Sequence, residues 1–272
     1  MKTILITGSS SGIGKSCKIV FLKNGFKVIG LDINEQNNED NLLPFKTSIL
    51  DENNLKSISE YLSNNNIKLD IILNVAGIHK MASLVENEFN DLKKVIDVNL
   101  QGTMLINNIF HKHLKEKGRI IIVTSEVAGF DPMPFNGLYN VSKTALDCYA
   151  QALRQELNLL GQKVITIRPG AIKTPLCDKS LEDTNKLALS TNLYKNQAHK
   201  FLKLTKKFMG KPLNSEKIAK LIYKAAIVKK PKLVYKKHRN LGLILLNLLP
   251  IKLQCHIIKL LLNHWKKWVF II

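Results

Sequence analysis

A tyrosine and a lysine four residues apart, Tyr139 and Lys143, form the pair in this sequence best suited to proton transfer. Both fall early in a segment with helical spacing, 137–160, so they share one helical face. With an unperturbed pKa of about 10, a tyrosine is a poor base at neutral pH. A neighbouring ammonium group favours the phenolate and brings the pKa of the tyrosine toward neutrality. Such a pair is usually structural, so the surrounding residues must decide whether it does chemistry.

A glycine turn near the start of the chain has the form of a phosphate-binding loop. An apolar run, 3–7, leads into a Gly/Ser turn that opens a segment with helical spacing, 15–23. Gly8 would allow the tight turn, Gly12 the approach of a pyrophosphate to the backbone, and Gly14 close packing of helix on strand. The helix N-terminus would offer unpaired N–H groups to the anion. This spacing differs from the commoner G-x-G-x-x-G, and it predicts a dinucleotide site only together with other signals.

An acid ends the second apolar run, and it bears on the choice of dinucleotide. Asp32 follows Gly8 by 24 residues, where an acid accepts hydrogen bonds from the adenosine ribose and repels a 2′-phosphate. Ile33 stands where an arginine would favour the phosphorylated cofactor. Lys15 is the one residue near the turn that could reach such a phosphate. The sequence therefore favours NAD, with NADP as the alternative.

The elements that would position these residues alternate between strands and helices. The expected strands are 3–7, 26–32, 45–49, 69–74, 119–125 and 163–168, and the expected helices are 12–24, 52–65, 85–115 and 137–160. This alternation predicts an α/β fold, a Rossmann-type doubly wound parallel sheet in a three-layer α/β/α arrangement. In such a sheet the ligand lies at the carboxyl ends of the strands.

Further polar and small residues follow these strand ends. Asn74, at the end of the fourth strand, could tie neighbouring strands, and the small residues Ala76 and Gly77 would let a cofactor lie against the backbone. The fifth strand brings Ser125 and Glu126 to the same edge. Asn99 lies on a helical pattern, where an asparagine is usually solvated or locally bonded. It matters only if its helix runs beside the site.

Together these residues resemble the short-chain dehydrogenase/reductase family over residues 1–180. The motifs are Thr7-Gly-Ser-Ser-Ser-Gly-Ile-Gly14, Asn74-Val-Ala-Gly77, Asn99, Ser125, Tyr139-x-x-x-Lys143 and Arg168-Pro-Gly-Ala-Ile-Lys-Thr174. The resemblance implies an NAD(P)-dependent oxidoreductase that moves a hydride between a nicotinamide and an alcohol or carbonyl group. The oxidised nicotinamide would add its positive charge to that of Lys143 in lowering the pKa of the tyrosine.

The resemblance also implies a role for each matching residue. Tyr139 would exchange a proton with the substrate oxygen, Lys143 would lower the tyrosine pKa and hold the nicotinamide ribose, Ser125 would bind the substrate oxygen, and Asn99 would place a water in a proton relay. The cofactor would lie against Gly8, Ser10, Ser11, Gly12, Ile13, Gly14, Asp32, Asn74, Ala76, Gly77, Tyr139, Lys143, Pro169, Gly170 and Thr174. Homodimers or homotetramers are usual in the family.

The sequence departs from the family pattern at two places that affect the site. Thirteen residues separate Ser125 from Tyr139, one more than the family usually has, so strict spacing would put Glu126 in the place of the serine. We expect Ser125, because a carboxylate would repel the substrate oxygen and the Pro-rich loop 130–136 can absorb an insertion. Ser48 stands where the family often has an adenine-contacting Asp, and Asp51 is interpreted as a helix N-cap.

For the C-terminal third, the sequence predicts a lid that belongs to a single domain, 1–238, and an extension that follows this domain. Residues 176–212 would cover the substrate pocket with an apolar face, to which we assign Leu176, Leu187, Leu193, Tyr194, Phe201 and Phe208. A helix at 215–228 would begin with Ser215 as N-cap, and 231–235 would form a last strand.

The apolar and basic extension, 239–272, has no run of the ~20 residues that would span a bilayer. Its character resembles that of steroid and retinol dehydrogenases and suits a helix lying in an anionic membrane surface. Packing of this tail on the lid or on a second subunit is the alternative.

Charge and cysteines limit the remaining classes of function. The net charge is +20, and residues 193–272 carry nineteen Lys or Arg against one acid, Glu216. No recognition motif or stacking platform accompanies these lysines, which argues against nucleic-acid binding. The four cysteines are scattered, so no metal site is expected, and with no visible signal peptide we expect a cytoplasmic protein, peripheral on the inner face of a membrane. The sequence thus favours oxidation or reduction of a lipophilic alcohol or ketone, with a 3-oxoacyl-thioester reductase or a non-catalytic dinucleotide sensor as alternatives.

Overall fold

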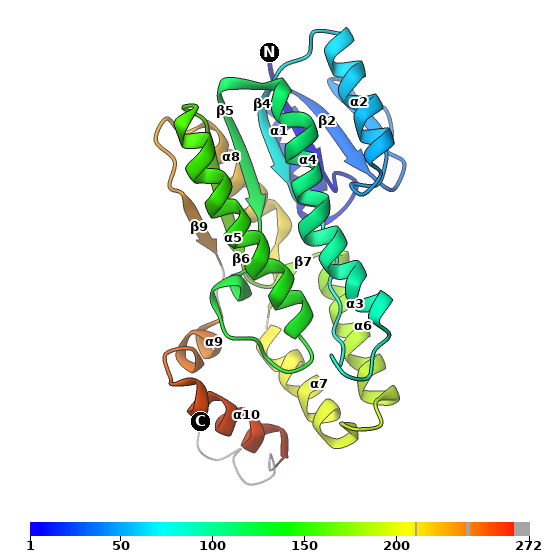
Figure 1. The fold of residues 1–272 in the computed structure, drawn as a ribbon, viewed down its shortest axis with the longest axis vertical. Coiled ribbons are helices and arrows are strands. Elements are labelled where there is room, and N and C mark those ends of the chain that lie inside the picture. Colours follow the sequence, from blue (N-terminus) through cyan, green and yellow to red (C-terminus); the bar gives the residue numbers. More distant parts are fainter. Residues whose placement is uncertain (210, 238–239, 264–272) are drawn as a thin grey trace.

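The core of the molecule is a parallel sheet of seven strands, in the order β3-β2-β1-β4-β5-β6-β9 (Figure 1). The computed structural model describes residues 1–209, 211–237 and 240–263, without the side chains of 208 and 209. The strands are β1 (Lys2–Thr7), β2 (Phe26–Asp32), β3 (Leu42–Lys46), β4 (Leu69–Asn74), β5 (Leu114–Val123), β6 (Lys163–Pro169) and β9 (Val234–Lys237). The order reverses between β1 and β4, and a ligand crevice is expected beyond the carboxyl ends of such strands. The predicted doubly wound fold is confirmed.

Helices cover both faces of this sheet. One face carries α2 (Glu52–Asn64), α4 (Gly102–Phe110) and α5 (Gly137–Leu159), and the other carries α1 (Gly12–Lys23) and α8 (Ser215–Ile227). Alternate strand residues feed the two cores: Leu5 packs toward α2, α4 and α5, while Ile4 and Ile6 pack toward α1 and α8. Because both faces are buried, the inner strands are apolar at successive positions, as in β1.

Several element boundaries differ from the sequence-based prediction. The third strand is 42–46 rather than 45–49; it includes Pro44, which a strand at the sheet edge tolerates. The expected helix 85–115 is divided into α3 (Phe89–Ile96), a π-helical turn (Asp97–Gln101) and α4. The last strand is 234–237 rather than 231–235.

The capping residue of α8 also differs from the prediction. Asn214, not Ser215, is the N-cap, because its Oδ1 accepts the Glu216 N–H at 2.9 Å. The Ser215 hydroxyl instead shares a 2.8 Å hydrogen bond with that of Ser16 on α1. This contact joins the two helices of one face.

The C-terminal part of the chain forms a second layer of helices beyond the carboxyl edge of the sheet. It comprises α6 (Pro175–Ser190), α7 (Lys195–Met209), α9 (Leu241–Leu246) and α10 (Ile251–Asn263), and it occupies the lower end of the view in Figure 1. A short pair of strands, β7 (Ile172–Lys173) and β8 (Leu213–Asn214), lies at its base. Leu262 of α10 packs with Phe201 and Leu204 of α7 in a separate apolar cluster. Along the described residues, the tail therefore packs on the lid.

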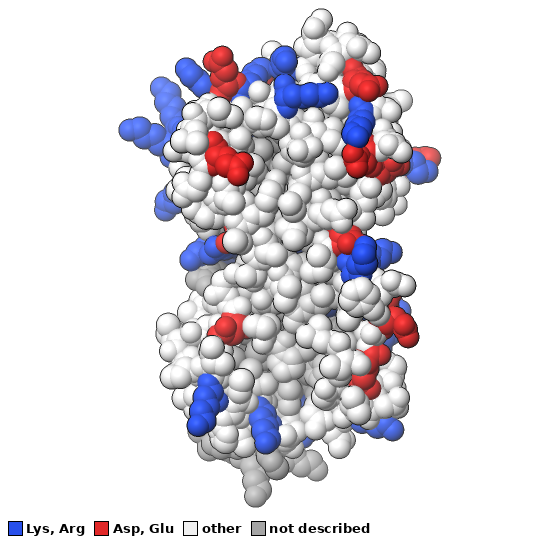
Figure 2. All heavy atoms as spheres, viewed as in Figure 1, with Lys and Arg blue, Asp and Glu red and all other residues white. Residues whose placement is uncertain are grey.

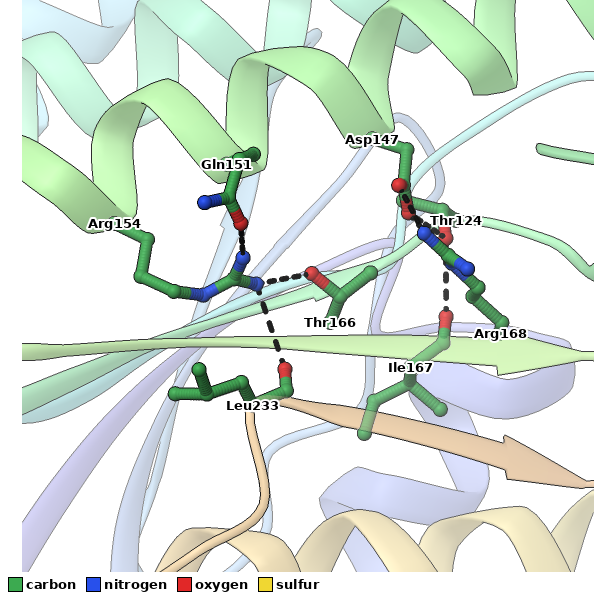
Figure 3. A network of polar contacts seen from close by, with 8 residues as sticks. All are labelled: Thr124, Asp147, Gln151, Arg154, Thr166, Ile167, Arg168 and Leu233. Atoms are coloured by element: carbon green, nitrogen blue, oxygen red, sulfur yellow. Dashed lines mark hydrogen bonds and ion pairs between the residues drawn. The ribbon is translucent and has the colours of Figure 1, made fainter. Parts of the chain in front are cut away.

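A polar network fixes α5 to the sheet (Figure 3). Asp147 accepts a hydrogen bond from Arg168 Nε at 2.9 Å and pairs with a second nitrogen of the same guanidinium, and Thr124 Oγ1 lies 3.3 Å from its Oδ1. Two turns further along α5, Arg154 donates to the Val164 carbonyl at 3.0 Å and to Thr166 at 2.8 Å. The network sets the position of α5, and hence of any residue near its N-terminus, relative to the ends of β5 and β6.

Candidate active site

A cavity of about 680 Å³ runs along the carboxyl ends of the strands, between the sheet and the lid helices. Its lining includes most of the predicted site: Gly8, Ser11, Gly12, Ile13, Asp32, Ala76, Gly77, Ser125, Tyr139, Lys143, Pro169, Gly170 and Thr174. Four predicted residues are not among the described residues that line it: Ser10, Gly14, Asn74 and Asn99. The chain thus brings residues from five strand ends to one hollow.

The glycine turn has the backbone that its sequence predicts. Gly8 and Gly12 have φ of +70° and +52°, in the left-handed region that favours glycine. A Cβ on Gly14 would lie 1.9 Å from the Gly8 carbonyl oxygen, so only glycine fits where α1 passes the turn. Thr7 Oγ1 accepts the N–H groups of Val75 and Ala76, both at 3.1 Å, and so joins this turn to the end of β4. The turn leaves bare backbone facing the cavity, which fits a dinucleotide pyrophosphate.

Asp32 lies at the end of β2 with its carboxylate beside the turn. Its two oxygens accept the N–H groups of Ser10 and Asn34, each at 2.9 Å, so the side chain is fixed in place and 7% exposed. Ser10 therefore reaches the site through Asp32 rather than through the cavity wall. Lys15, which could have reached a 2′-phosphate, is exposed and is not among the described residues that line the cavity.

Tyr139 and Lys143 point into the cavity from the first turns of α5. Lys143 Nζ lies 5.7 Å from the centre of the Tyr139 ring and donates to the Val123 carbonyl at 3.4 Å. The Ser125 hydroxyl lies near enough to the Tyr139 hydroxyl to affect its pKa. The three side chains meet because β5 ends beside the N-terminus of α5.

Burial changes the proton affinities of this pair. Burial raises the pKa of Tyr139 to about 12, and the Ser125 hydroxyl opposes that shift. Burial also lowers the pKa of Lys143 to about 8, which leaves most of it protonated at neutral pH. In the protein alone the pKa of Tyr139 thus lies further from neutrality than the ordinary value, because burial disfavours the charged phenolate. A lowered tyrosine pKa with an oxidised nicotinamide bound beside Lys143 stays a prediction. At neutral pH the phenol keeps its proton and is ready to donate it.

Ser125 rather than Glu126 faces the tyrosine, although both line the cavity. The Glu126 carboxylate is turned toward the C-terminal segment, where Oε2 accepts the Asn240 N–H at 2.7 Å. The segment that follows is tied to the start of α5, because Asn140 Nδ2 donates to the carbonyls of Val127 and Phe130. A catalytic role for Ser125 stays a prediction, and the position of its side chain in the site agrees with that role.

Asn99 and Asn74 lie just behind the cavity wall. Asn99 is fully buried in the π-helical turn, where its Oδ1 accepts the Ile78 N–H at 2.8 Å and its Nδ2 donates to the Ile78 carbonyl and to Ser142. A π-helical turn within a helix often marks a functional position. Asn74 donates to Asn107 of α4 at 2.9 Å, so it ties β4 to a helix rather than to a neighbouring strand. Both asparagines hold the loop after β4 in place.

Asp51 has the role that the sequence predicted for it. Its Oδ1 accepts the Asn54 N–H at 3.0 Å and so caps α2. Ser48, three residues earlier, lines the cavity in the place where the family often has an acid.

The lid contributes part of the expected apolar wall. Leu176 and Cys177 at the start of α6 line the cavity, and Leu187 and Phe201 are buried behind it. Leu193 is 66% exposed and points away from the lid core, contrary to the prediction. The side chain of Phe208 lies outside the described residues, as does the segment 264–272.

Two residues of the site were not singled out from the sequence. His79 follows the Asn74–Gly77 motif by two residues, and its ring centre lies 4.2 Å from that of Tyr139. Asn136, the N-cap of α5, also lines the cavity. The sequence held one signal for each of them. His79 directly follows a strand-end motif, and Asn136 directly precedes the helix that carries Tyr139.

Comparison with known proteins agrees with this geometry. The family model of short chain dehydrogenases matches residues 2–185. An NADPH-dependent 1-acyldihydroxyacetone phosphate reductase of Schizosaccharomyces pombe is 32% identical over 198 residues, which cover 70% of this chain and 67% of that protein. A 3-oxoacyl-(acyl-carrier-protein) reductase of Thermotoga maritima is 30% identical over 201 residues, which cover 70% of this chain and 81% of that protein.

A solved structure extends the likeness in fold. A short-chain dehydrogenase of Streptomyces avermitilis covers 95% of each chain with a TM-score of 0.74 at 18% identity. With the glycine turn, the buried Tyr139–Lys143 pair and the matched family model, the conclusion is direct. The chain belongs to the short-chain dehydrogenase/reductase family and is an NAD(P)-dependent oxidoreductase acting on an alcohol or carbonyl group.

Proposed function

We propose that the protein reduces the carbonyl group of a lipophilic substrate. The observation that carries the proposal is the grouping of Ser125, Tyr139 and Lys143 along one cavity, and the direction is supported by the two named relatives, which are both reductases. With a pKa raised to about 12, the phenol is a proton donor at neutral pH, as the reduction of a carbonyl requires. The bound nicotinamide would supply the hydride. Ser125 binds the carbonyl oxygen beside the phenol, and the Lys143 ammonium adds positive charge where negative charge develops.

A lipophilic substrate is supported by the walls of the cavity nearest the lid. Met81, Leu176 and Cys177 line it there, with the apolar cluster of α7 and α10 behind them. The two named relatives are reductases of an acylated ketone and of an acyl thioester. The 3-oxoacyl-thioester reductase remains the second candidate, supported by the Thermotoga maritima relative.

We further propose NAD as the preferred cofactor. Asp32 holds a carboxylate, fixed by two backbone N–H groups, at the end of β2 where the adenosine ribose of a dinucleotide would lie. A 2′-phosphate would meet that charge without a described lysine or arginine among the lining residues of the turn and β2 end. The Schizosaccharomyces pombe relative is NADPH-dependent, so the preference must be measured rather than transferred.

The activity should appear as oxidation of NADH by methyl ketones of increasing chain length. Each methylene buried on binding contributes about 0.8 kcal/mol, so kcat/KM should rise about fourfold per added carbon until the pocket is filled. Kinetics with NADH and NADPH, run beside 3-oxoacyl thioesters, steroids and retinoids, measure substrate class and cofactor preference together. A larger kcat/KM for the thioester than for a ketone of equal length would select the second candidate. Tight cofactor binding without turnover of any substrate would instead indicate a dinucleotide sensor.

The C-terminal helices offer a surface for an anionic membrane, and we propose that they bind one. None of the described helices is long and apolar enough to cross a bilayer. Around α9 and the start of α10, however, apolar side chains face outward: Leu241 (74% exposed), Leu245 (65%), Leu248 (75%) and Ile251 (67%). Lys252 and Lys259 are exposed on the same segment. An apolar strip with flanking lysines suits a helix lying in the interface.

Flotation with vesicles of anionic phospholipid should recover the wild-type chain in the vesicle fraction. Replacing Leu245, Leu248 and Ile251 by glutamine removes apolar area without changing charge, and should abolish most of that recovery. The matched control replaces Leu159 and Leu160 by glutamine as well. These two side chains are 85% and 60% exposed at the C-terminal end of α5. Equal flotation of the two variants would show that the proposed surface is not the one that binds.

The homodimer or homotetramer expected from the family resemblance stays a prediction. The described surface offers a place for it on α4 and α5, where Met104 and Val141 are 44% and 52% exposed. Few charged side chains lie along the middle of this face in Figure 2.

A further inference from the structure

Ser125 and Tyr139 are joined by one loop, residues 126–136, and both ends of this loop line the cavity. Glu126 lines it directly after Ser125, and Asn136 lines it shortly before Tyr139. A shift of this loop would therefore move the two hydroxyl groups relative to each other. Since a displacement of about 1 Å between reacting groups can slow a reaction severely, the contacts that hold the loop matter for the reaction.

Phe135, near the end of this loop, has a backbone conformation that its surroundings must hold. Its φ is +63°, in the left-handed region, where a bulky residue is strained. Its ring packs edge-on against those of Tyr194 and Phe201 in the lid, with centroids 5.3 and 5.2 Å away. Its carbonyl accepts the Ala82 N–H at 2.8 Å. A strained residue just before the helix of Tyr139 can relax, and shift that helix, when contacts elsewhere in the loop are lost.

The middle of the loop is held by the tail segment, residues 240–254, which lies next to it in Figure 1. The Asp131 N–H donates to Asn247 Oδ1 at 2.6 Å, and Asp131 Oδ2 accepts a hydrogen bond from Gln254 Nε2 at 2.9 Å. Gln254 is 5% exposed, so its amide is buried where it meets the loop. Asn247 Nδ2 donates to the Leu243 carbonyl at 2.9 Å, which orients the oxygen that faces the loop.

The hydrogen bond between Glu126 and the Asn240 N–H makes a third link, at the start of the loop. Glu126 is 8% exposed, so this link is made inside the molecule rather than on its surface. All the partners in the tail segment lie beyond residue 185, where the match to the family model ends. The chain therefore uses a segment outside the matched region to hold the loop between two residues of the family motifs.

We propose that Asn247 and Gln254 are positioning residues for the reaction. Through Asp131 they hold the loop, and so the two hydroxyl groups beyond its ends, in the arrangement that carbonyl reduction requires. Neither side chain is among the described residues that line the cavity, so both act through the loop and not on the substrate. The inference rests on the proposed carbonyl reduction and gives the tail segment a role in that reaction, separate from its membrane surface.

The test is the double variant Asn247→Ala/Gln254→Met, which removes both side-chain links to Asp131 and keeps the length of the buried glutamine. Without vesicles present, kcat for the best carbonyl substrate should fall about tenfold or more, because the two hydroxyl groups lose their fixed arrangement. Hydrogen–deuterium exchange in 126–136 should become faster. NADH should bind with an affinity close to that of the wild type, since the tail segment holds the loop and not the glycine turn. Asn247→Ala alone repeats the test if the double variant does not fold.

Two further comparisons separate positioning from general damage. Asp131→Asn keeps an oxygen for the Gln254 amide and should keep the wild-type rate, whereas Asp131→Ala should lower kcat about threefold or more. Asn263→Ala is the matched control, because it removes a 2.8 Å hydrogen bond from Gln197 of α7 that holds α10 to the lid and not to the loop. This variant should keep the wild-type kcat.

The outcomes distinguish this inference from the proposed function. A double variant with the wild-type kcat, a loss of rate without faster exchange in the loop, or an equal loss in Asn263→Ala overturns the inference and leaves carbonyl reduction standing. Failure of the wild type to reduce any ketone, thioester, steroid or retinoid of the panel removes the proposed function and this inference with it.

Discussion

Replacing Tyr139 by phenylalanine should lower kcat for carbonyl reduction by a factor of about 10² to 10⁴, the usual contribution of a positioned proton donor. The substitution removes only the hydroxyl that faces Ser125 and leaves the ring that packs on His79. The fold and the glycine turn should therefore stay intact. The measurement is single-turnover oxidation of bound NADH with a saturating ketone, together with a cofactor titration.

The control for this substitution lies on the same helix. Tyr149 accepts a hydrogen bond from Asn107 at 3.3 Å, away from the described lining of the cavity, so Tyr149→Phe should change kcat by less than about threefold. NADH should bind both variants with affinities close to that of the wild type. A Tyr139→Phe enzyme with more than a tenth of the wild-type rate would show that another group gives up the proton.

The pH profile of the wild type follows from the same pair of residues. Tyr139, with a pKa near 12, stays protonated throughout the neutral range. Lys143, with its pKa lowered to about 8, is charged below that value and loses its charge as the pH rises through it. The rate of reduction should therefore be level below about pH 8 and fall above it. A rate that rises through pH 8 would indicate that an ammonium at Lys143 hinders the reaction.

The sequence predicted the site well wherever the chain itself forces the geometry. The turn at Gly8–Gly14 needs glycine for reasons of backbone, and the period of apolar runs places strand ends together, so Asp32, Ser125 and the Tyr139–Lys143 pair could all be assigned to one edge. The sequence could not show that burial would raise the tyrosine pKa. That depends on the elements packed around α5, which are far away in the chain.

The predictions that were wrong, ambiguous or missing share a different physical cause. Asn214 and Ser215 are both good capping residues, and the hydroxyl of Ser215 was taken up by Ser16, about two hundred residues away in the chain. Glu126 was ambiguous because spacing alone counts residues, whereas the structure turns its carboxylate toward the C-terminal segment. His79 gave no local signal, since its ring contact with Tyr139 is made between residues sixty positions apart in the chain. Such choices among competing partners are made by tertiary contacts.

Replacing Gly14 by alanine should destabilise the fold more than any other single methyl group added at a described glycine of the cofactor turn. The added Cβ would lie 1.9 Å from the Gly8 carbonyl oxygen and 2.7 Å from its carbon. Both are backbone atoms, so no side-chain rotation relieves the contact. Helix α1 would have to move away from β1, although Cys17 and Phe21 pack it into the core beside α8. Overpacking of this kind costs about 3 kcal/mol or more, and it should lower Tm by roughly 6–12 °C in a domain of this size.

Gly25→Ala separates this clash from the general cost of losing a glycine. Gly25 has a φ of +74° but open space around its missing Cβ, so alanine there adds only left-handed backbone strain of about 1 kcal/mol. Because Gly14 also sets the path of the turn that would face the pyrophosphate, NADH should raise Tm in the wild type and in Gly25→Ala but not in Gly14→Ala. A Gly14→Ala protein with the same Tm as Gly25→Ala, and still stabilised by NADH, would contradict this prediction. It would show that α1 can move away from the turn without loss of the cofactor site. The ends of β2 and β4 alone would then form that site.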